Sequence, residues 1–212
     1  PKIVISDERA QALETGGGIK HALPLLGEGP VFVANIDSVW IEHGGAAIDA
    51  VAAAWDPEAM DVCLMLASTS GSLGFHDSGD VFLEDGVVRF KDPGEIAPLV
   101  YVGVHICKPA ITADGPEGPF SLLPLWKRLA ADHRVHGVAP DGLWMHVGDP
   151  AARDAADRHP PRLPRTSVSL PLWRPGRRAQ ASRRQDRRLG VLHLGQRLCR
   201  HQQSRHQGCG RD

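Results

Sequence analysis

The stretch VFVANIDS, residues 31–38, decides the fold. It is a continuous apolar run that reaches Asn35 and is bounded by turn signals, a pattern typical of a strand buried on both faces of a parallel sheet. The run gives way to polar groups, so that Asp37 stands where the strand ends. Open α/β sheets bind their ligands at the carboxyl ends of such strands, and Asp37 is therefore the first candidate for a functional residue.

The segments after this strand predict a helix and a second buried strand. Apolar residues across 46–55 are spaced as on one face of a helix, and residues 62–67 form another continuous apolar run. Strand, helix and strand in this order indicate an α/β sheet with mainly parallel pairing. Before residue 31, the pattern predicts a short strand over 2–6 and a helix over 19–26.

The next part of the chain predicts a hairpin and further alternating elements. Residues 79–83 and 87–90 read as two strands joined by an Asp85-Gly86 turn. A strand is expected over 99–106 and a helix over 121–131. Short strands over 135–138 and 143–147 and a helix from Pro150 follow.

Charge divides the chain into two unlike parts. Residues 1–157 hold 10 Lys and Arg against 23 Asp and Glu, a net −13, whereas residues 158–212 hold 14 Arg against 2 Asp, a net +12. We therefore expect a folded domain over 1–157. The Arg/Pro-rich tail over 158–212 should be disordered, because it has too little apolar surface to offset the entropy of ordering it.

The tail admits two interpretations. Its Lys-free, Arg/Pro/Gln/His-rich composition is typical of a shifted reading frame, which favours an appendage without a role. The alternative is a nucleic-acid-binding arm, but Trp173 is the tail's one aromatic residue, so base stacking is scarcely available and we expect non-specific contact at most. The spacing of its His and Cys residues matches no common zinc finger.

The apolar runs and the cysteines bear on membrane contact and on the redox environment. No apolar run approaches the roughly 18 residues that a membrane helix needs, and no signal peptide opens the chain. The four cysteines form no CxxC pair, and Cys63 and Cys107 fall inside strand-like apolar runs. This pattern favours reduced, buried thiols and a cytoplasmic protein that does not contact a membrane.

The block LETGGGIK, residues 13–20, followed by ALPLL at 22–26 and NIDS at 35–38, resembles the sugar-1-phosphate nucleotidyltransferases. Within that family, the similarity points to the branch of N-acetylmuramate-1-phosphate uridylyltransferases. Further blocks occur in the family's order at residues 79–80, 101–104, 118–122 and 143–148. The resemblance thus extends across residues 1 to about 155.

This resemblance implies a fold and a reaction. The fold is an incomplete doubly wound, mainly parallel α/β sheet of the nucleotidyltransferase (GT-A-like) type. The reaction is transfer of a nucleotidyl group from UTP to a sugar 1-phosphate, with N-acetylmuramate 1-phosphate as the leading acceptor, release of pyrophosphate and Mg²⁺ as cofactor. Such an enzyme would serve nucleotide-sugar biosynthesis in peptidoglycan recycling. The alternative is an inactive remnant of the family that binds a sugar nucleotide.

The resemblance also implies site residues. Asp37 would hold the metal and be catalytic, although a carboxylate there could merely cap the following turn. The glycine-rich block would bind the nucleotide through Glu14, Thr15, Gly16 and Gly17, although a plain loop and helix start could use the same glycines. The sugar-binding positions would be Asn35, Gly79, Asp80 and Gly103.

His146 departs from the family's pattern, in which a second metal-binding Asp usually precedes Val-Gly. Imidazole is a poorer ligand for Mg²⁺ than carboxylate. His146 is therefore predicted either to bind metal weakly, to contact phosphate, to leave the role to Asp149, or to pack behind the site.

The family begins with an apolar strand, a Gly-rich triphosphate loop that carries an Arg, and a Pro-Lys-Pro segment with a catalytic Lys. The sequence joins the pattern beyond these features. We therefore expect a sheet that lacks its first strand and phosphate loop. Its edge should be exposed, which predicts poor solubility.

Overall fold

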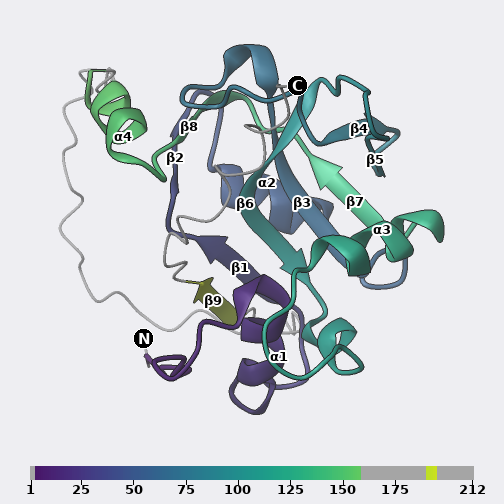
Figure 1. Cartoon of the computed structure of the whole chain (residues 1–212). Coiled ribbons are helices and arrows are strands. Elements are labelled where there is room, and N and C mark those ends of the chain that lie inside the picture. The colour runs from purple at the N-terminus through teal and green to yellow at the C-terminus, as the bar shows by residue number, and fades with distance from the viewer. Residues whose placement is uncertain (1–2, 159–189, 195–212) are drawn as a thin grey trace, which may run out of the picture.

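The computed structural model describes residues 3–158 and 190–194 of the 212-residue chain (Figure 1). The helices are α1 (Glu14–Leu26), α2 (Ala47–Ala54), α3 (Leu123–Ala131) and α4 (Pro150–Asp157), with 3-10 turns η1 (Thr69–Gly71) and η2 (Pro109–Thr112). The strands are β1 (Val31–Asn35), β2 (Ser38–Glu42), β3 (Val62–Ser68), β4 (Val81–Glu84), β5 (Val87–Phe90), β6 (Leu99–Cys107), β7 (Val135–Val138), β8 (Gly142–His146) and β9 (Gly190–Leu194). Among the described helices, none is long and apolar enough to cross a bilayer.

One large sheet organises the fold. Its strand order is β3-β7-β5-β4-β6-β1-β9, with β3 also paired to β6. Strands β1 and β3 run in the same direction and are joined through α2, but the antiparallel strand β6 lies between them and pairs with both. Strand β7 pairs in parallel with β3. The α/β sheet expected from the sequence is confirmed, but the mainly parallel pairing is wrong. Among the described strands, β1–β9 and β3–β7 pair in parallel, whereas β6 and β5 pair antiparallel with each of their neighbours.

Helices cover both faces of this sheet, which is the doubly wound arrangement. Strand residues alternate between the faces: Val31 and Val33 pack on the side of α1 and α3, whereas Phe32 packs on the side of α2. Ile19 of α1 and Trp126 of α3 enter the first core, and Val51 of α2 enters the second. Because both faces are covered, β1 and β3 are continuous apolar runs up to their last residues, rather than apolar at every second position.

Local sequence signals mostly hold, and one does not. The Asp85-Gly86 turn has φ of 51° and 83°, as a two-residue hairpin turn requires, and α2, α3 and α4 lie where they are expected. The strand predicted over 2–6 is wrong for residues 3–6. These residues have no regular structure, and Ile3 and Ile5 are exposed. An apolar run favours a strand only where a neighbouring strand or a core receives it.

A small second sheet was not foreseen. Strand β2 pairs antiparallel with β8, with Ser38 opposite His146 and Trp40 opposite Trp144. The half-polar sequence of β2 gave no strong alternation, so the pattern indicated only the end of β1. This pairing matters for function because it brings residues 37–38 to residues 146–148.

Strand β9 covers the edge of β1. The two strands pair in parallel along all five residues, from Val31 opposite Gly190 to Asn35 opposite Leu194 (Figure 1). The exposed edge expected at β1 is therefore wrong in this structure, since a segment of the same chain pairs with it. The rest of the tail prediction, for residues 159–189 and 195–212, lies outside the described residues.

Two of the cysteines are buried as expected. Cys63 and Cys107 are free and fully buried. Burial raises the pKa of the Cys63 thiol to about 11 and that of the Cys107 thiol to about 12, so both stay protonated and unreactive at neutral pH. Cys199 and Cys209 lie outside the described residues.

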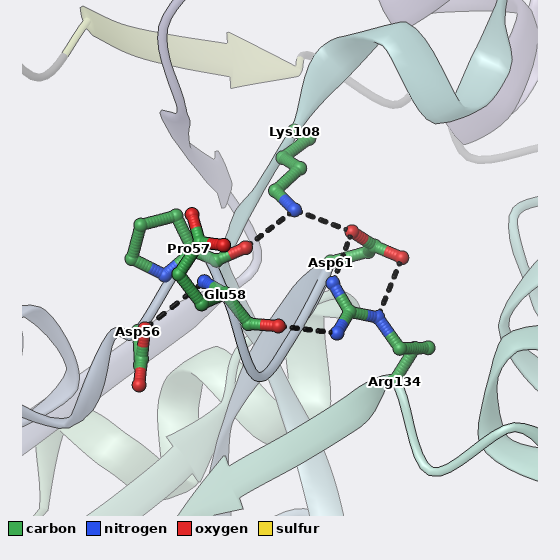
Figure 2. Close-up of polar contacts among 6 residues, drawn as sticks. All are labelled: Asp56, Pro57, Glu58, Asp61, Lys108 and Arg134. Carbon is green, nitrogen blue, oxygen red and sulfur yellow. Dashed lines mark hydrogen bonds and ion pairs between the residues drawn. The ribbon is translucent and has the colours of Figure 1, made fainter.

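Ion pairs join three strand ends at the end of the sheet where β3 and β7 begin and β6 finishes. Figure 2 shows Asp61, which precedes β3, between Lys108 after β6 and Arg134 before β7. The Asp61 carboxylate accepts hydrogen bonds from Lys108 Nζ at 2.7 Å and from the Arg134 guanidinium at 3.0 and 3.1 Å. The same cations also donate to the carbonyls of Pro57 and Glu58. This cluster ties the loop 56–61 to β6 and β7.

The cluster predicts acid-sensitive stability. Hydrogen bonds from Arg134, followed by those from Lys108, lower the pKa of Asp61 from its ordinary 3.8 to about 2. A lowered folded-state pKa means that the stabilisation is complete above pH 4 and is lost as the pH falls towards 2. Because the carboxylate is partly solvated, we expect its contribution to be about 1–2 kcal/mol.

Asp61→Asn should therefore lower the free energy of unfolding by about 1–2 kcal/mol at pH 7 and by roughly half as much at pH 3. Urea unfolding followed by circular dichroism at both pH values measures this difference. Asp114→Asn, at an exposed position, is the control. An equal loss at both pH values would contradict the role of the Asp61 charge.

Candidate nucleotide-sugar site

A cavity of about 580 Å³ opens between α3, the β4–β5 hairpin and the end of β1. Thr15, Asn35 and Asp80, three of the residues singled out in the sequence, line it together. Its other walls are Lys91 to Ile96, which follow β5, and residues of α3 and β6. A monosaccharide with its substituents fits such a volume, and the mixture of apolar wall and few polar groups is typical of small-molecule sites.

Asn35 lines the cavity, and Gly103 packs behind it. Gly103 has φ of +82°, and an added Cβ would meet Asn35 Cβ at 3.0 Å and Ser38 Oγ at 3.2 Å. Ser38 is itself fixed, since its hydroxyl donates to Val102 O at 2.6 Å and accepts from Trp144 Nε1 at 3.1 Å. The glycine therefore lets β6 approach the end of β1 closely and holds the Asn35 side chain in place.

Asp80 supplies a half-buried carboxylate to the cavity. It accepts a hydrogen bond from the Tyr101 backbone N–H at 3.0 Å. Burial raises its pKa, and the backbone bond and the charge of Lys91 act in the opposite direction. Lys91 lies in the same wall and donates to Ser78 Oγ at 2.6 Å. Gly79 does not line the cavity; it packs against the Ala97 carbonyl instead.

Asp37 and His146 come together beside this cavity. Val147 N donates to Asp37 O at 2.8 Å across the β2–β8 pair. An added Cβ on Gly148 would lie 2.6 Å from His146 Nε2 and 3.6 Å from Asp37 Cβ, so both side chains flank this glycine. Asp149 is occupied elsewhere, because its Oδ1 caps α4 by accepting from Ala152 N at 2.9 Å.

This donor set fits Mg²⁺ in a limited way. Within the described residues, no group of three His, Cys, Asp or Glu side chains converges as a complete metal cage. Mg²⁺ is commonly held by one or two carboxylates together with substrate phosphates and waters, so one carboxylate at Asp37 is compatible with it. His146 is the weaker candidate, for the chemical reason already given.

The glycine-rich block does not form the open loop expected. Helix α1 begins at Glu14, and Gly16, Gly17 and Gly18 are buried in its first turns. Gly16 N and Gly17 N both donate to Phe120 O, at 2.8 and 3.2 Å. An added Cβ on Gly16 would overlap the Phe120 ring, and one on Gly17 the Gly118 carbonyl. These glycines thus have a packing role here, and Thr15 alone of the block reaches the cavity.

Comparison with known proteins finds close relatives. No family model matches the chain. The chain is 85% identical over 158 residues to the N-acetylmuramate alpha-1-phosphate uridylyltransferase of Caulobacter vibrioides, covering 74% of this chain and 65% of the relative. It is 34% identical over 149 residues to the protein of the same name from Neisseria meningitidis, covering 69% and 62%. The chain therefore spans just under two thirds of the length of these relatives.

Over this segment the chain is similar to two proteins named N-acetylmuramate alpha-1-phosphate uridylyltransferase.

Solved structures share its fold. A UDP-glucose pyrophosphorylase complexed with UDP-glucose matches with a TM-score of 0.52 at 17% identity, over 70% of this chain and 64% of that one. HddC from Yersinia pseudotuberculosis, complexed with GMP-PN, matches with 0.51 at 17% identity, over 70% and 63%. At such identities the match establishes the nucleotidyltransferase fold and no more.

Sequence reasoning missed part of this cavity. Tyr101, His105 and Trp126 form its aromatic wall, with Trp126 edge-on to both partners at ring-centre distances of 5.1 and 5.0 Å. The Tyr101 hydroxyl and His105 Nδ1 are 2.7 Å apart and hydrogen-bonded, and burial lowers the pKa of His105 to about 3, which keeps it neutral. The period-two placement of Tyr101 and His105 on β6 was the available signal.

Proposed function

We propose that this protein transfers a uridylyl group from UTP to N-acetylmuramate 1-phosphate and releases pyrophosphate, with Mg²⁺ as cofactor. The observation that carries the proposal is the cavity at the carboxyl end of β1, with Asn35 in its wall and Asp37 just beyond. The name of the 85% identical Caulobacter relative supports the choice of nucleotide and sugar. We place this activity in the cytoplasm, in peptidoglycan recycling.

The reaction requires two anions to meet. An oxygen of the sugar phosphate attacks the α-phosphorus of UTP, a new P–O bond forms, and the bond to the β-phosphate oxygen breaks. Asp37 would hold Mg²⁺, which when bound would neutralise phosphate charge and orient the leaving pyrophosphate. Asn35 and Asp80 would position the sugar through hydrogen bonds in the cavity, and Thr15 would contact the nucleotide.

A second candidate is a protein that binds the nucleotide sugar without turnover. It is favoured by the incomplete donor set around Asp37 within the described residues. It is also favoured by the engagement of Gly16 N and Gly17 N with Phe120 O, which leaves these donors unavailable to a nucleobase in this structure. The two candidates share the cavity and differ only in chemistry.

Two measurements on the full chain separate the candidates. The first is pyrophosphate release from UTP, Mg²⁺ and N-acetylmuramate 1-phosphate, with N-acetylglucosamine 1-phosphate as a comparison acceptor. The second is calorimetric titration with the corresponding UDP-sugars. Release of pyrophosphate supports the transferase, binding without release supports the binding protein, and the absence of both would overturn both candidates.

A further inference from the structure

Charges are distributed unevenly around the cavity. Its wall contains three carboxylates, on Asp80, Asp92 and Glu95, and two ammonium groups, on Lys91 and Lys127. Each carboxylate already has a cation near it. Glu95 accepts from Arg89 at 2.8 Å, the charge of Asp92 acts on the same Arg89, and Lys91 acts on Asp80.

Lys127 is the remaining charge. It lies in α3, which packs beside β5 and β7 (Figure 1), and its solvent-exposed side chain is part of the cavity lining, as are residues 91–96. Its ammonium group has no hydrogen bond or ion pair with any of the described residues. Lys91, by contrast, is bound to the Ser78 hydroxyl. The α3 side of the cavity therefore presents an uncompensated positive charge.

The surroundings of Lys127 suit a substituent that has an apolar part next to the sugar ring and an anionic group at its end. Leu123 and Trp126 of the same helix and Leu122 at its N-cap line the cavity, and the largely exposed Ile96 also lines it. Asp37 and His146, the candidate phosphate and metal residues, lie with the β2–β8 pair and do not line the cavity. An anionic group on the sugar other than the phosphate would therefore lie near Lys127 and not near Asp37 or His146.

We propose that Lys127 determines acceptor specificity by binding a carboxylate on the sugar, so that the cavity selects an acidic amino sugar over its neutral counterpart. This inference rests on the proposed function, since it assigns one part of the same sugar site. An N-acetylmuramoyl group differs from an N-acetylglucosaminyl group by one lactyl ether, which carries a small apolar methyl-bearing carbon and a carboxylate. That difference matches the apolar wall and the free ammonium.

The test compares UDP-N-acetylmuramate with UDP-N-acetylglucosamine by calorimetry on the full chain. Lys127→Met, which keeps the length and removes the charge, should weaken binding of the acidic ligand by about 5- to 30-fold, the range of a charge-assisted hydrogen bond in a partly solvated site. Binding of the neutral ligand should change by less than about twofold. Lys127→Arg should keep most of the preference for the acidic ligand.

Arg128→Met is the matched control, because Arg128 is the next residue of α3, is exposed and does not line the cavity. It should leave both affinities unchanged. Equal losses for both ligands in Lys127→Met, or no loss for the acidic one, would overturn the inference alone. Binding of neither ligand by the unaltered protein would overturn the proposed function and the inference with it.

Discussion

Asp37→Asn should reduce Mg²⁺-dependent pyrophosphate release by about 100- to 1,000-fold, the scale expected when a carboxylate that holds a catalytic metal loses its charge. The fold should not change, because the contact that Asp37 makes across the β2–β8 pair uses its backbone carbonyl. The affinity for UTP should also lose its dependence on Mg²⁺, which calorimetry with and without the metal measures independently of turnover.

Asp49→Asn controls for the removal of a carboxylate, since Asp49 is exposed on α2 and lies outside the cavity wall. His146→Asn provides a second comparison and should have a smaller effect than Asp37→Asn, because imidazole contributes less to Mg²⁺ binding. Unchanged Mg²⁺ dependence in Asp37→Asn would refute the assignment of Asp37 as the metal ligand.

Gly79→Ala should destabilise the fold by about 2–4 kcal/mol, because two costs add at this position. Its φ is +71°, which an L side chain rarely adopts, and an added Cβ would overlap the carbonyl oxygen of Ala97. That carbonyl belongs to the backbone beside β6 and cannot rotate away. Thermal unfolding should show a decrease in Tm of roughly 6–12 °C for a domain of this size.

Gly94→Ala separates the two costs. Gly94 also has a positive φ, of +90°, but nothing lies within 4 Å of an added Cβ. The Gly94→Ala variant should therefore lose about 1 kcal/mol of its free energy of unfolding, the cost of the unfavourable backbone conformation alone. If Gly79→Ala were no worse than Gly94→Ala while UDP-sugar binding disappeared, Gly79 would act through the ligand, as the family resemblance implies, and not through packing.

The elements with strong local signals could be predicted from the sequence. The apolar runs of β1 and β3, the Asp85-Gly86 hairpin and the apolar face of α3 each depend on residues close together in the chain. Asp37 was found for the same reason, because a polar residue after a buried strand lies at the ligand-binding edge of an α/β sheet, whereas Asn35 was identified by the family resemblance. The β2 strand carried no such signal, and the apolar run at residues 3–6 carried a strand signal that no neighbouring strand satisfies.

The sequence by itself determined the class of the fold and the residue types at the end of β1. Only the tertiary structure decided what those residues meet. The insertion of β6 between β1 and β3, the β2–β8 pair that joins Asp37 to His146, and the contact of Gly16 and Gly17 with Phe120 all link segments far apart in the chain. Local periodicity reports which face of an element is buried, but not which partner buries it. The cavity and its free Lys127 arise from those partners, so no stretch of sequence alone could show them.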